Sequence, residues 1–469
     1  IPEPGTLGAD TWPVDSDVWR FGGGGVWMTP TVDVSLGTFY VGTGNAVPMW
    51  GGELRPGDNL FTSSVVALDL RTGEYKWHQQ LVHHDIWEHD LATPLIVYDA
   101  TVDGRTRKAI AAMRTDGYLF MLDAETGEPT FPVEERPVPQ DEFLETSPTQ
   151  PFPVGADKVG GDCVDPDMIP DGFVAGCYYD PIGPDQPNTF IPYMTMRFAP
   201  MSYSPITGYF YGTACVYPRW IKRPENPWFF NNTTVRAPGL KQYGLHVALD
   251  SRTNRIAWQH RVPHSDCNSS GAMTTRSGLM FHTEPDGTLG AYDQRTGDRL
   301  WQFQTGQIGI FGSNGLGGGP VVTYEVDGEQ YVGLTMNREV WAFKLGGTVP
   351  PGPTPEAPFT VLPFQDPVVD VDTVELKRVI TQSNENTGRN DEWHDEYGLT
   401  PTRASVATGS RVTWTNPTDL THTMAARDGS WSTGPIAPGG SDSVVIDVAG
   451  EHEYVCTDHP WTIGQLIVR

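Results

Sequence analysis

Short stretches of alternating apolar and polar residues recur along the chain, separated by turns rich in glycine and proline. The segments SVVIDV and GQLIVR near the C-terminus are examples, and such alternation indicates half-buried strands. The sequence contains 52 glycines and 41 prolines. It contains neither an apolar run with the 3.6-residue period of a helix nor an apolar stretch of about 18 residues. We therefore predict an all-β protein without a membrane span.

One strand–turn–strand pattern occurs four times. The copies are VVALDLRTGEYKW, LFMLDAETGEPTF, HVALDSRTNRIAW and LGAYDQRTGDRLW, with the aspartate at positions 69, 123, 250 and 293. The aspartate can accept hydrogen bonds from the backbone that follows it, and glycine supplies a positive φ. Four unrelated hairpins of this length are improbable. A period of roughly 40 to 55 residues predicts about four to five blades of a β-propeller, with the closing aromatic packed between blades.

The composition changes sharply after the repeats. Residues 348–367 are rich in proline and are predicted to form a semi-rigid linker. We therefore expect a propeller region in residues 1–347 and a second domain in residues 368–469. About 100 residues is an ordinary domain size, and the alternation in this part favours a small β-sandwich.

Charge and cysteine content bear on class and compartment. The net charge of −27 argues against a nucleic-acid partner, which would require a basic surface. Four of the five cysteines lie in the middle of the chain and could form two disulfides, with Cys163–Cys177 and Cys215–Cys267 as one of three possible pairings. The first residue is Ile1, without a signal peptide, so we expect a processed chain or a fragment of a periplasmic or extracellular protein.

The fifth cysteine belongs to a different pattern. Cys456 and His459 lie three residues apart in a loop between two strands, and His422 follows a strand further upstream. One thiolate and two imidazoles form the ligand set of a type 1 copper site. The domain resembles the plastocyanin and amicyanin branch of the cupredoxins, which implies copper bound by His422, Cys456 and His459. Thr462 stands where the closest loops of that family place the axial methionine, so we expect a raised copper potential, unless the fold has lost its metal.

Ionisable residues also cluster in the loop LVHHDIWEHDLATP, residues 81–94. Glu88 and Asp90 are separated by one residue, so in an extended segment they point the same way and could hold a hard cation or provide a base. Upstream, FGGGGVW places Trp27 beside a flexible backbone, and YVGTGNAVP places Asn45 after a strand. Taken singly, these features also fit a turn, a core tryptophan and a cap.

Together, the segments GGGGVW, VGTGNAVP, HHDIWEHDLATP and GPVVTYEVDGEQYVGL are similar to the quinoprotein alcohol and glucose dehydrogenases. The resemblance covers about residues 15–345 and implies the C-terminal portion of an eight-bladed-type propeller that binds pyrroloquinoline quinone. By this resemblance Trp27 stacks on the quinone, and Asn45, Glu88 and Asp90 lie at a Ca²⁺ or lanthanide ion. Glu88 stands where the family has its catalytic aspartate. The family has a lysine or arginine that contacts the cofactor in the second repeat, and its position falls on Thr115 in this sequence. The neighbouring Arg114 could replace that side chain only if the backbone shifts.

The resemblance also implies a reaction. The cation polarises a quinone carbonyl, Glu88 takes the proton of an alcohol, polyol or sugar, and hydride passes to the quinone. No C-x-x-C-H haem motif is present, so the fused copper domain is the expected first acceptor, followed by a carrier such as a cytochrome. By this resemblance the family's N-terminal blades are missing from this sequence. A second chain could supply them, they could belong to a longer form of this chain, or the chain could form a smaller ring or a ring by self-association.

Two further interpretations remain. The chain could be a non-catalytic electron-transfer or interaction protein in which only the copper domain is redox active. It could also be a copper oxidase, but that class needs additional histidine clusters, which the sequence lacks.

Overall fold

The computed structural model describes most of residues 2–469. Outside the described residues lie 1, 14–17, 19–21, 50, 103, 141–145, 171–172, 181–188, 193–194, 198, 221–239, 263–270, 308–318, 337–338, 355–367, 383–392 and 459–461. For residues 220, 378–382 and 393–397 only the backbone is described. Within these limits the chain is all-β, and its short helical elements are 3-10 turns at Ala9–Thr11, Gly52–Leu54 and Pro166–Met168. None of the described helices is long and apolar enough to cross a membrane.

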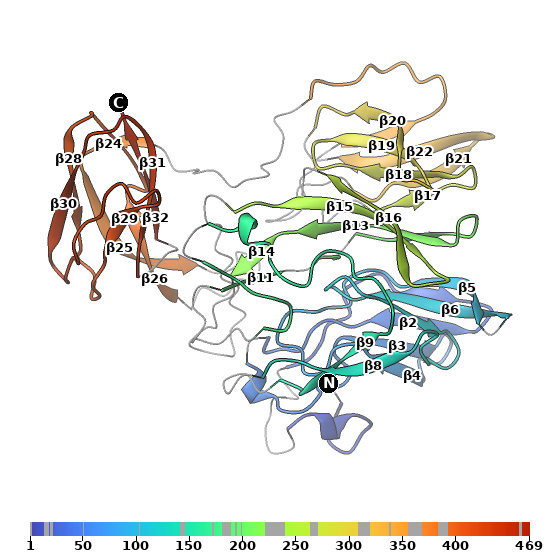
Figure 1. Cartoon of the computed structure of the whole chain (residues 1–469). Helices are drawn as coiled ribbons and strands as arrows, with labels where there is room; N and C mark the ends of the chain where they lie inside the picture. Colours follow the sequence, from blue (N-terminus) through green and yellow to red (C-terminus); the bar gives the residue numbers. More distant parts are fainter. Residues whose placement is uncertain are drawn as a thin grey trace.

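Antiparallel sheets follow one another along residues 31–343 (Figure 1). The first sheet consists of β1 (Thr31–Asp33), β2 (Thr38–Gly42), β3 (Ser64–Asp69) and β4 (Tyr75–Gln80). The next contains β5 (Ile96–Val102), β6 (Arg105–Met113) and β7 (Leu119–Asp123), followed by the hairpin of β8 (Val133–Pro137) and β9 (Thr149–Pro153). Because each sheet runs strand to neighbouring strand, it forms a blade-like meander.

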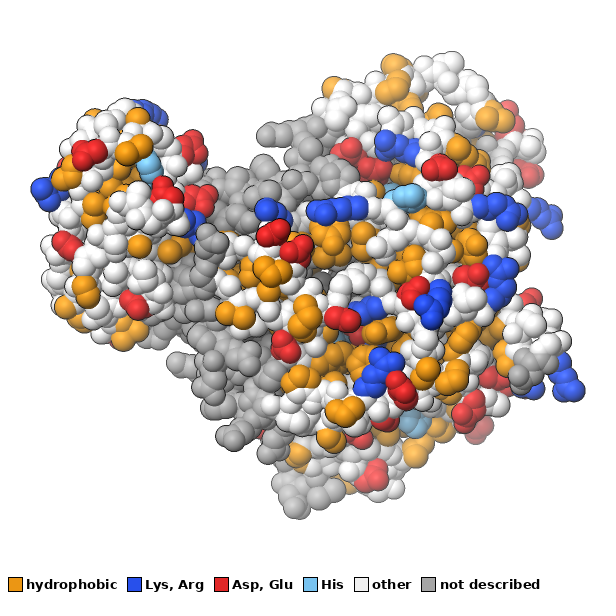
Figure 2. All heavy atoms as spheres, viewed as in Figure 1, with side chains coloured by type: hydrophobic (Ala, Val, Ile, Leu, Met, Phe, Trp, Pro, Cys, Tyr) orange, Lys and Arg blue, Asp and Glu red, His pale blue; other side chains and the backbone are white. Residues whose placement is uncertain are grey.

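Three more sheets continue this order. They consist of β12 (Ser202–Ser204), β13 (Tyr209–Val216), β15 (Tyr243–Asp250) and β16 (Arg255–Val262); of β17 (Met273–Thr274), β18 (Leu279–Thr283), β19 (Thr288–Asp293) and β20 (Arg299–Gln304); and of β21 (Val322–Val326), β22 (Glu329–Met336) and β23 (Glu339–Phe343). Figure 2 shows acidic and basic side chains interspersed with hydrophobic ones on the visible face of these sheets.

The four repeated turns have the local chemistry that the sequence predicts. The Oδ1 atom of Asp69 accepts hydrogen bonds from the backbone N–H groups of residues 71 and 72. The Oδ1 atoms of Asp123 and Asp293 likewise accept from the backbone N–H groups two and three positions later. The left-handed position is filled by Gly73, Gly127 and Gly297, with φ between 74° and 78°, and by an asparagine, Asn254, in the third copy. Asparagine is among the residues that tolerate this conformation best.

The closing aromatic of a repeat packs on the turn of the following sheet. The indole Nε1 of Trp77 donates to the carbonyl of Ala124 at 3.3 Å, and that of Trp258 donates to the carbonyl of Gln294 at 3.0 Å. Ala124 and Gln294 each directly follow the turn aspartate. The repeat therefore encodes both the hairpin and its contact with the next blade.

A small sheet interrupts the blades. It consists of β10 (Val174–Ala175), β11 (Thr189–Pro192) and β14 (Pro218–Trp220). A disulfide joins Cys163, which precedes β10, to Cys177, which lies between β10 and β11, as in the first half of the pairing considered from the sequence. Cys215 is also in a disulfide, and Cys267 lies outside the described residues. We call this sheet the insertion.

The C-terminal part forms two sheets packed face to face. One contains β24 (Val368–Asp370), β27 (Arg403–Val406), β32 (Ile463–Val468), β31 (Gly450–Cys456) and β29 (Met424–Ala426). The other contains β26 (Trp393–Thr400), β25 (Thr373–Gln382), β28 (Ser410–Thr415) and β30 (Ser441–Ile446). A core that includes Trp414, Tyr454 and Leu466 fills the space between them, so this part is a β-sandwich with its own core.

Candidate active site

The loop of residues 81–94 is held in shape by one buried aspartate. Asp85 accepts a hydrogen bond from the backbone of Trp87 at 2.9 Å on one carboxylate oxygen, and from the backbone of His89 at 2.7 Å on the other. The guanidinium of Arg55 donates to the carbonyl of Asp85 at 2.6 Å. Glu88 adopts a φ of +66°, a left-handed conformation that costs a non-glycine residue about 1–2 kcal/mol. The surrounding bonds therefore hold a strained segment in place.

Glu88 and Asp90 both lie beside Arg197, although the left-handed backbone of Glu88 departs from the extended segment on which the expectation from their spacing rested. The Nη2 atom of Arg197 lies 3.6 Å from Oε1 of Glu88 and 3.7 Å from Oδ2 of Asp90. Both carboxylates are buried. A second arginine, Arg219 on β14, places Nη1 at 2.7 Å from Oε2 of Glu88 and is itself fully buried. The site therefore pairs two carboxylates with two guanidinium groups.

The environment of Asp90 differs from that of Glu88. The backbone N–H of Asn45 donates to Oδ1 of Asp90 at 2.7 Å. Burial raises the pKa of Asp90 to about 7, with Arg197 opposing the shift and the negative charge of Glu88 adding to it. The side-chain nitrogen of Asn45 donates to the carbonyl of Ala46 at 3.1 Å, which leaves the amide oxygen as the atom suited to a cation.

Trp27 borders the same site. Its ring centroid lies 5.8 Å from the guanidinium carbon of Arg197. A Cβ atom added to Gly44 would lie 2.7 Å from Oδ1 of Asp90 and 3.0 Å from Nε1 of Trp27, so the backbone at Gly44 passes between the two side chains. Trp27 is 43% exposed, and a partly exposed flat ring beside charged groups suits a planar, anionic molecule.

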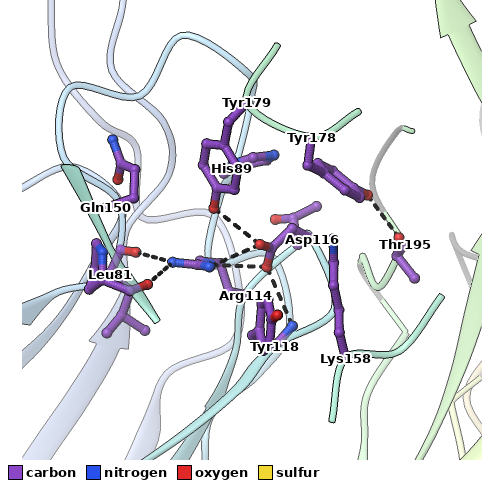
Figure 3. Close-up of polar contacts among 12 residues, drawn as sticks. Leu81, His89, Arg114, Asp116, Tyr118, Gln150, Lys158, Tyr178, Tyr179 and Thr195 are labelled. Carbon is purple, nitrogen blue, oxygen red and sulfur yellow. Dashed lines mark hydrogen bonds and ion pairs between the residues drawn. The ribbon is translucent and has the colours of Figure 1, made fainter. Parts of the chain in front are cut away.

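The predicted cofactor contact of Arg114 is not supported by the geometry. Arg114 forms a two-point ion pair with Asp116 at 2.9 Å and donates to the carbonyls of Leu81 and Pro151 at 2.8 and 2.7 Å (Figure 3). The neighbouring Thr115 is the residue that faces the loop, because its hydroxyl donates to the carbonyl of Asp90. Arg114 directly follows β6 and Thr115 lies in the turn after it, where the backbone N–H of Gly117 donates to the carbonyl of Arg114 at 2.9 Å, so the two side chains have different surroundings.

Arg114 instead belongs to a buried network under the loop. Tyr179 donates to Asp116 at 3.1 Å, and its ring lies edge-on to Trp87 at 4.9 Å between centroids. Burial alone would raise the pKa of Asp116, but Arg114, and then Lys158, hold it below its usual range. Trp87 and His89 both pack against Tyr179 of this network, and Figure 3 shows His89 beside Tyr179. Glu88 and Asp90 instead face Arg197, and Glu88 also faces Arg219.

The three histidines of the loop do not converge. His83 contacts Gln80 and Glu135, His84 contacts the carbonyl of Gly57, and His89 packs between aromatic rings. Within the described residues no group of three or more His, Cys, Asp or Glu side chains is arranged to hold a metal ion. The acidic pair with Asn45 is thus a two-carboxylate site with an amide, whose oxygen donors suit a hard cation such as Ca²⁺.

A second candidate site lies in the β-sandwich. The Sγ atom of Cys456 lies 3.5 Å from Nδ1 of His422, and both side chains are buried. A metal bound to sulfur at about 2.3 Å and to nitrogen at about 2.0 Å in tetrahedral geometry would separate these atoms by about 3.5 Å. Thr462 is buried as well, and its carbonyl accepts the backbone N–H of Cys456 at 3.0 Å. The third predicted ligand, His459, lies outside the described residues.

A hydrogen-bond chain sets the tautomer of His422. The Thr418 hydroxyl donates to Oδ1 of Asn416 at 2.6 Å, so it must accept at its 2.9 Å contact with Nε2 of His422. The side-chain nitrogen of Asn416 donates to the carbonyls of Leu420 and Ile436, which fixes the orientation of its amide. The proton of His422 therefore lies on Nε2, and Nδ1 presents its lone pair toward Cys456. This is the state that a metal ligand requires.

The sheets in sequence, with their shared turn and aromatic contact, define a β-propeller-like fold. Residues 3–170 match the family described as the glucose/ethanol/alcohol dehydrogenase β-propeller domain, and residues 230–398 match that of the outer membrane protein assembly factor BamB. The propeller part of the chain is thus similar to the β-propeller domain of the glucose, ethanol and alcohol dehydrogenases.

Relatives and solved structures agree with this assignment. The chain is 32% identical to a quinohemoprotein alcohol dehydrogenase of Comamonas testosteroni, over 70% of this chain and 44% of that protein. It is 29% identical to the quinoprotein alcohol dehydrogenase PedH of Pseudomonas putida, over 72% and 52%. The crystal structure of the Comamonas testosteroni enzyme superposes with a TM-score of 0.52 at 27% identity, covering 74% of this chain and 52% of that one. The chain therefore spans about half the length of these relatives.

Sequence reasoning missed Arg197 and Arg219. They are far from the loop along the chain, and neither is part of a repeated turn or a recognisable motif. Only the return of the chain through the insertion brings them to Glu88.

Proposed function

We propose that the propeller part oxidises the hydroxyl group of an alcohol, polyol or sugar with pyrroloquinoline quinone. The observation that supports this best is the placement of Glu88, Asp90, Arg197 and Trp27 around one site, with Asn45 beside them. When bound beside a hard cation, the quinone supplies the carbonyl carbon that accepts a hydride. Asn45, Glu88 and Asp90 would hold Ca²⁺ or a lanthanide, since hard cations prefer oxygen ligands.

The chain's own residues divide the remaining work. Arg197 takes the place proposed for Arg114, because it lies between the ring of Trp27 and the two carboxylates and can bind an anionic group of the quinone. Arg219 pairs with Oε2 of Glu88 at 2.7 Å and fixes the position of this carboxylate. Glu88 then accepts the proton of the substrate hydroxyl, while Asp90 serves the cation.

We propose further that the β-sandwich is a cupredoxin with a type 1 copper site formed by His422, Cys456 and His459. The separation of Cys456 and His422, the tautomer set by Thr418 and the burial of both the Cys456 and the His422 side chains support this site. Copper there would carry one electron at a time. A cytochrome is the proposed downstream acceptor, a second chain could provide further blades, and the proposed location is the periplasm or the extracellular space.

The test uses the purified chain with pyrroloquinoline quinone and either Ca²⁺ or La³⁺, with ethanol, glycerol and glucose as substrates and an artificial dye as acceptor. We expect alcohol-dependent dye reduction that Glu88→Gln abolishes and that the exposed control Glu74→Gln retains. Quinone binding, followed by quenching of tryptophan fluorescence, should survive in Glu88→Gln. Dye reduction that is unchanged in Glu88→Gln would overturn the role of this residue. Quinone binding without turnover on any substrate, with a companion chain present, would favour an electron-transfer protein.

A further inference from the structure

The β-sandwich and the insertion share one hydrophobic cluster. Ile463 and Val455 of the sandwich pack with Val164, Phe190 and Leu240, and with the partly buried Phe173. Figure 1 shows the sandwich beside β11 and β14. Ile463 is 6% exposed and Phe190 is fully buried, so the contact excludes water. We call these residues the docking cluster.

On each side of the docking cluster, its residues are close neighbours of a candidate site. On the sandwich side, Ile463 follows Thr462, whose carbonyl accepts the backbone N–H of Cys456. Val455 directly precedes Cys456. The segment that carries the thiolate is thus the same segment that packs on the insertion.

On the propeller side, strand β11 has two functional faces. Phe190 belongs to the docking cluster, whereas the next residue, Ile191, packs in the core cluster that contains Trp87. Successive side chains of a strand point to opposite faces, which explains this division. Ile191 is also the register partner of Arg219 on β14, and Arg219 binds Glu88. One strand therefore separates the surroundings of Glu88 from those of Cys456.

We propose that the docking cluster is an intramolecular contact that fixes the Cys456 segment on the insertion and makes the sandwich the exit for electrons from the propeller site. This inference rests on the proposed function. Oxidation of one alcohol to a carbonyl compound releases two electrons and two protons, while cupric ion accepts one electron. Two electrons therefore cross the contact one after the other in each turnover. A soluble one-electron acceptor such as a cytochrome reoxidises the copper after each transfer.

The first experiment tests docking without cofactor or metal. Small-angle X-ray scattering is recorded for the chain, for Phe173→Asp and for the matched control Val174→Asp. Val174 adjoins Phe173 but is 57% exposed and lies outside the docking cluster. A buried charge without a partner is unfavourable, so we expect Phe173→Asp to increase the radius of gyration while Val174→Asp does not. Val455→Asp changes the other side of the contact and should act in the same way. An unchanged radius of gyration in both Phe173→Asp and Val455→Asp would overturn the docking role.

The second experiment follows electrons in the loaded protein. The protein loaded with quinone and Cu(II) is mixed with alcohol, and the loss of the blue absorption of thiolate-bound Cu(II) is timed. In Phe173→Asp we expect bleaching to slow about tenfold or more, because an undocked domain meets the site only at its tethered concentration. Dye reduction and the copper spectrum should be unchanged. Bleaching at the rate of the unmodified chain would refute the exit role. If the unmodified chain reduces no dye, the proposed function fails instead, and the scattering result still decides docking.

Discussion

The Nη1 atom of Arg219 lies 2.7 Å from Oε2 of Glu88, and both side chains are buried although 131 residues separate them in the chain. This ion pair ties the loop of residues 81–94 to strand β14 of the insertion. A guanidinium and a carboxylate removed from water depend on each other, and loss of Arg219 would leave Glu88 with only the more distant Arg197, 3.6 Å away, to compensate its charge.

Arg219→Met should therefore destabilise the chain by about 3–5 kcal/mol, measured by urea unfolding. The double variant Arg219→Met with Glu88→Gln removes both charges and should recover a large part of that loss. The two single variants and the double variant form a thermodynamic cycle that isolates the pair. A double variant no more stable than Arg219→Met alone would show that the two groups do not interact energetically.

Local features were predictable and long-range ones were not. The turns at Asp69 and Asp123 form through hydrogen bonds to residues two and three positions away, so a short sequence pattern was sufficient to predict them. The proximity of Glu88 and Asp90 was suggested by their spacing, but the left-handed backbone at Glu88 was not predictable from it. The cofactor contact predicted for Arg114 has no support in the geometry, because its guanidinium is bonded to Asp116 and to the carbonyls of Leu81 and Pro151, and the last two contacts depend on the fold. Arg197 and Arg219 reach the site only through the folded path of the insertion.

Thr418 should control the affinity of the copper site that we propose for the sandwich. Its hydroxyl accepts a hydrogen bond from the protonated Nε2 of His422. Loss of the hydrogen-bond partner of a ligating histidine typically weakens metal binding by about 10–100-fold. We expect this loss in Thr418→Val when copper binding is titrated by the blue absorption. Thr408→Val is the control, because Thr408 is exposed and bonds only the terminal backbone at Arg469. Equal copper affinities for the two variants would contradict the tautomer assigned to His422.

His84 should make stability fall in mild acid. Burial, with a smaller contribution from Arg55, lowers its pKa from 6.5 to about 4. As the pH falls below 6.5 the unfolded chain binds a proton first, so His84 removes stability progressively down to pH about 4. The slope is about 1.4 kcal/mol per pH unit, or roughly 3 kcal/mol in all.

The variant His84→Asn tests this dependence. Asparagine tolerates the φ of +45° at this position and can keep the 2.7 Å hydrogen bond to the carbonyl of Gly57, but it does not titrate. Between pH 6.5 and 4.5, the unfolding free energy of His84→Asn should therefore fall less steeply with decreasing pH than that of the unmodified chain. The difference in slope should correspond to one proton fewer taken up on unfolding. Parallel curves from denaturant titrations would exclude His84 as a source of the acid sensitivity.

Gly127 and Gly73 form a matched pair for testing how blades are held together. Both occupy the same turn position, with φ of 78° and 74°. A Cβ atom at Gly73 would have nothing within 4 Å, whereas one at Gly127 would overlap the six-membered ring of Trp77 from the preceding sheet. Gly73→Ala should thus cost only the left-handed strain of about 1–2 kcal/mol. Gly127→Ala should cost about 1–3 kcal/mol more, because Trp77 must move and its bond to Ala124 weakens. Urea unfolding of the two variants measures the difference directly. Equal losses would mean that Trp77 does not join the blades, whereas a larger loss at Gly127 would show that the repeated aromatic contributes to the contact between neighbouring sheets.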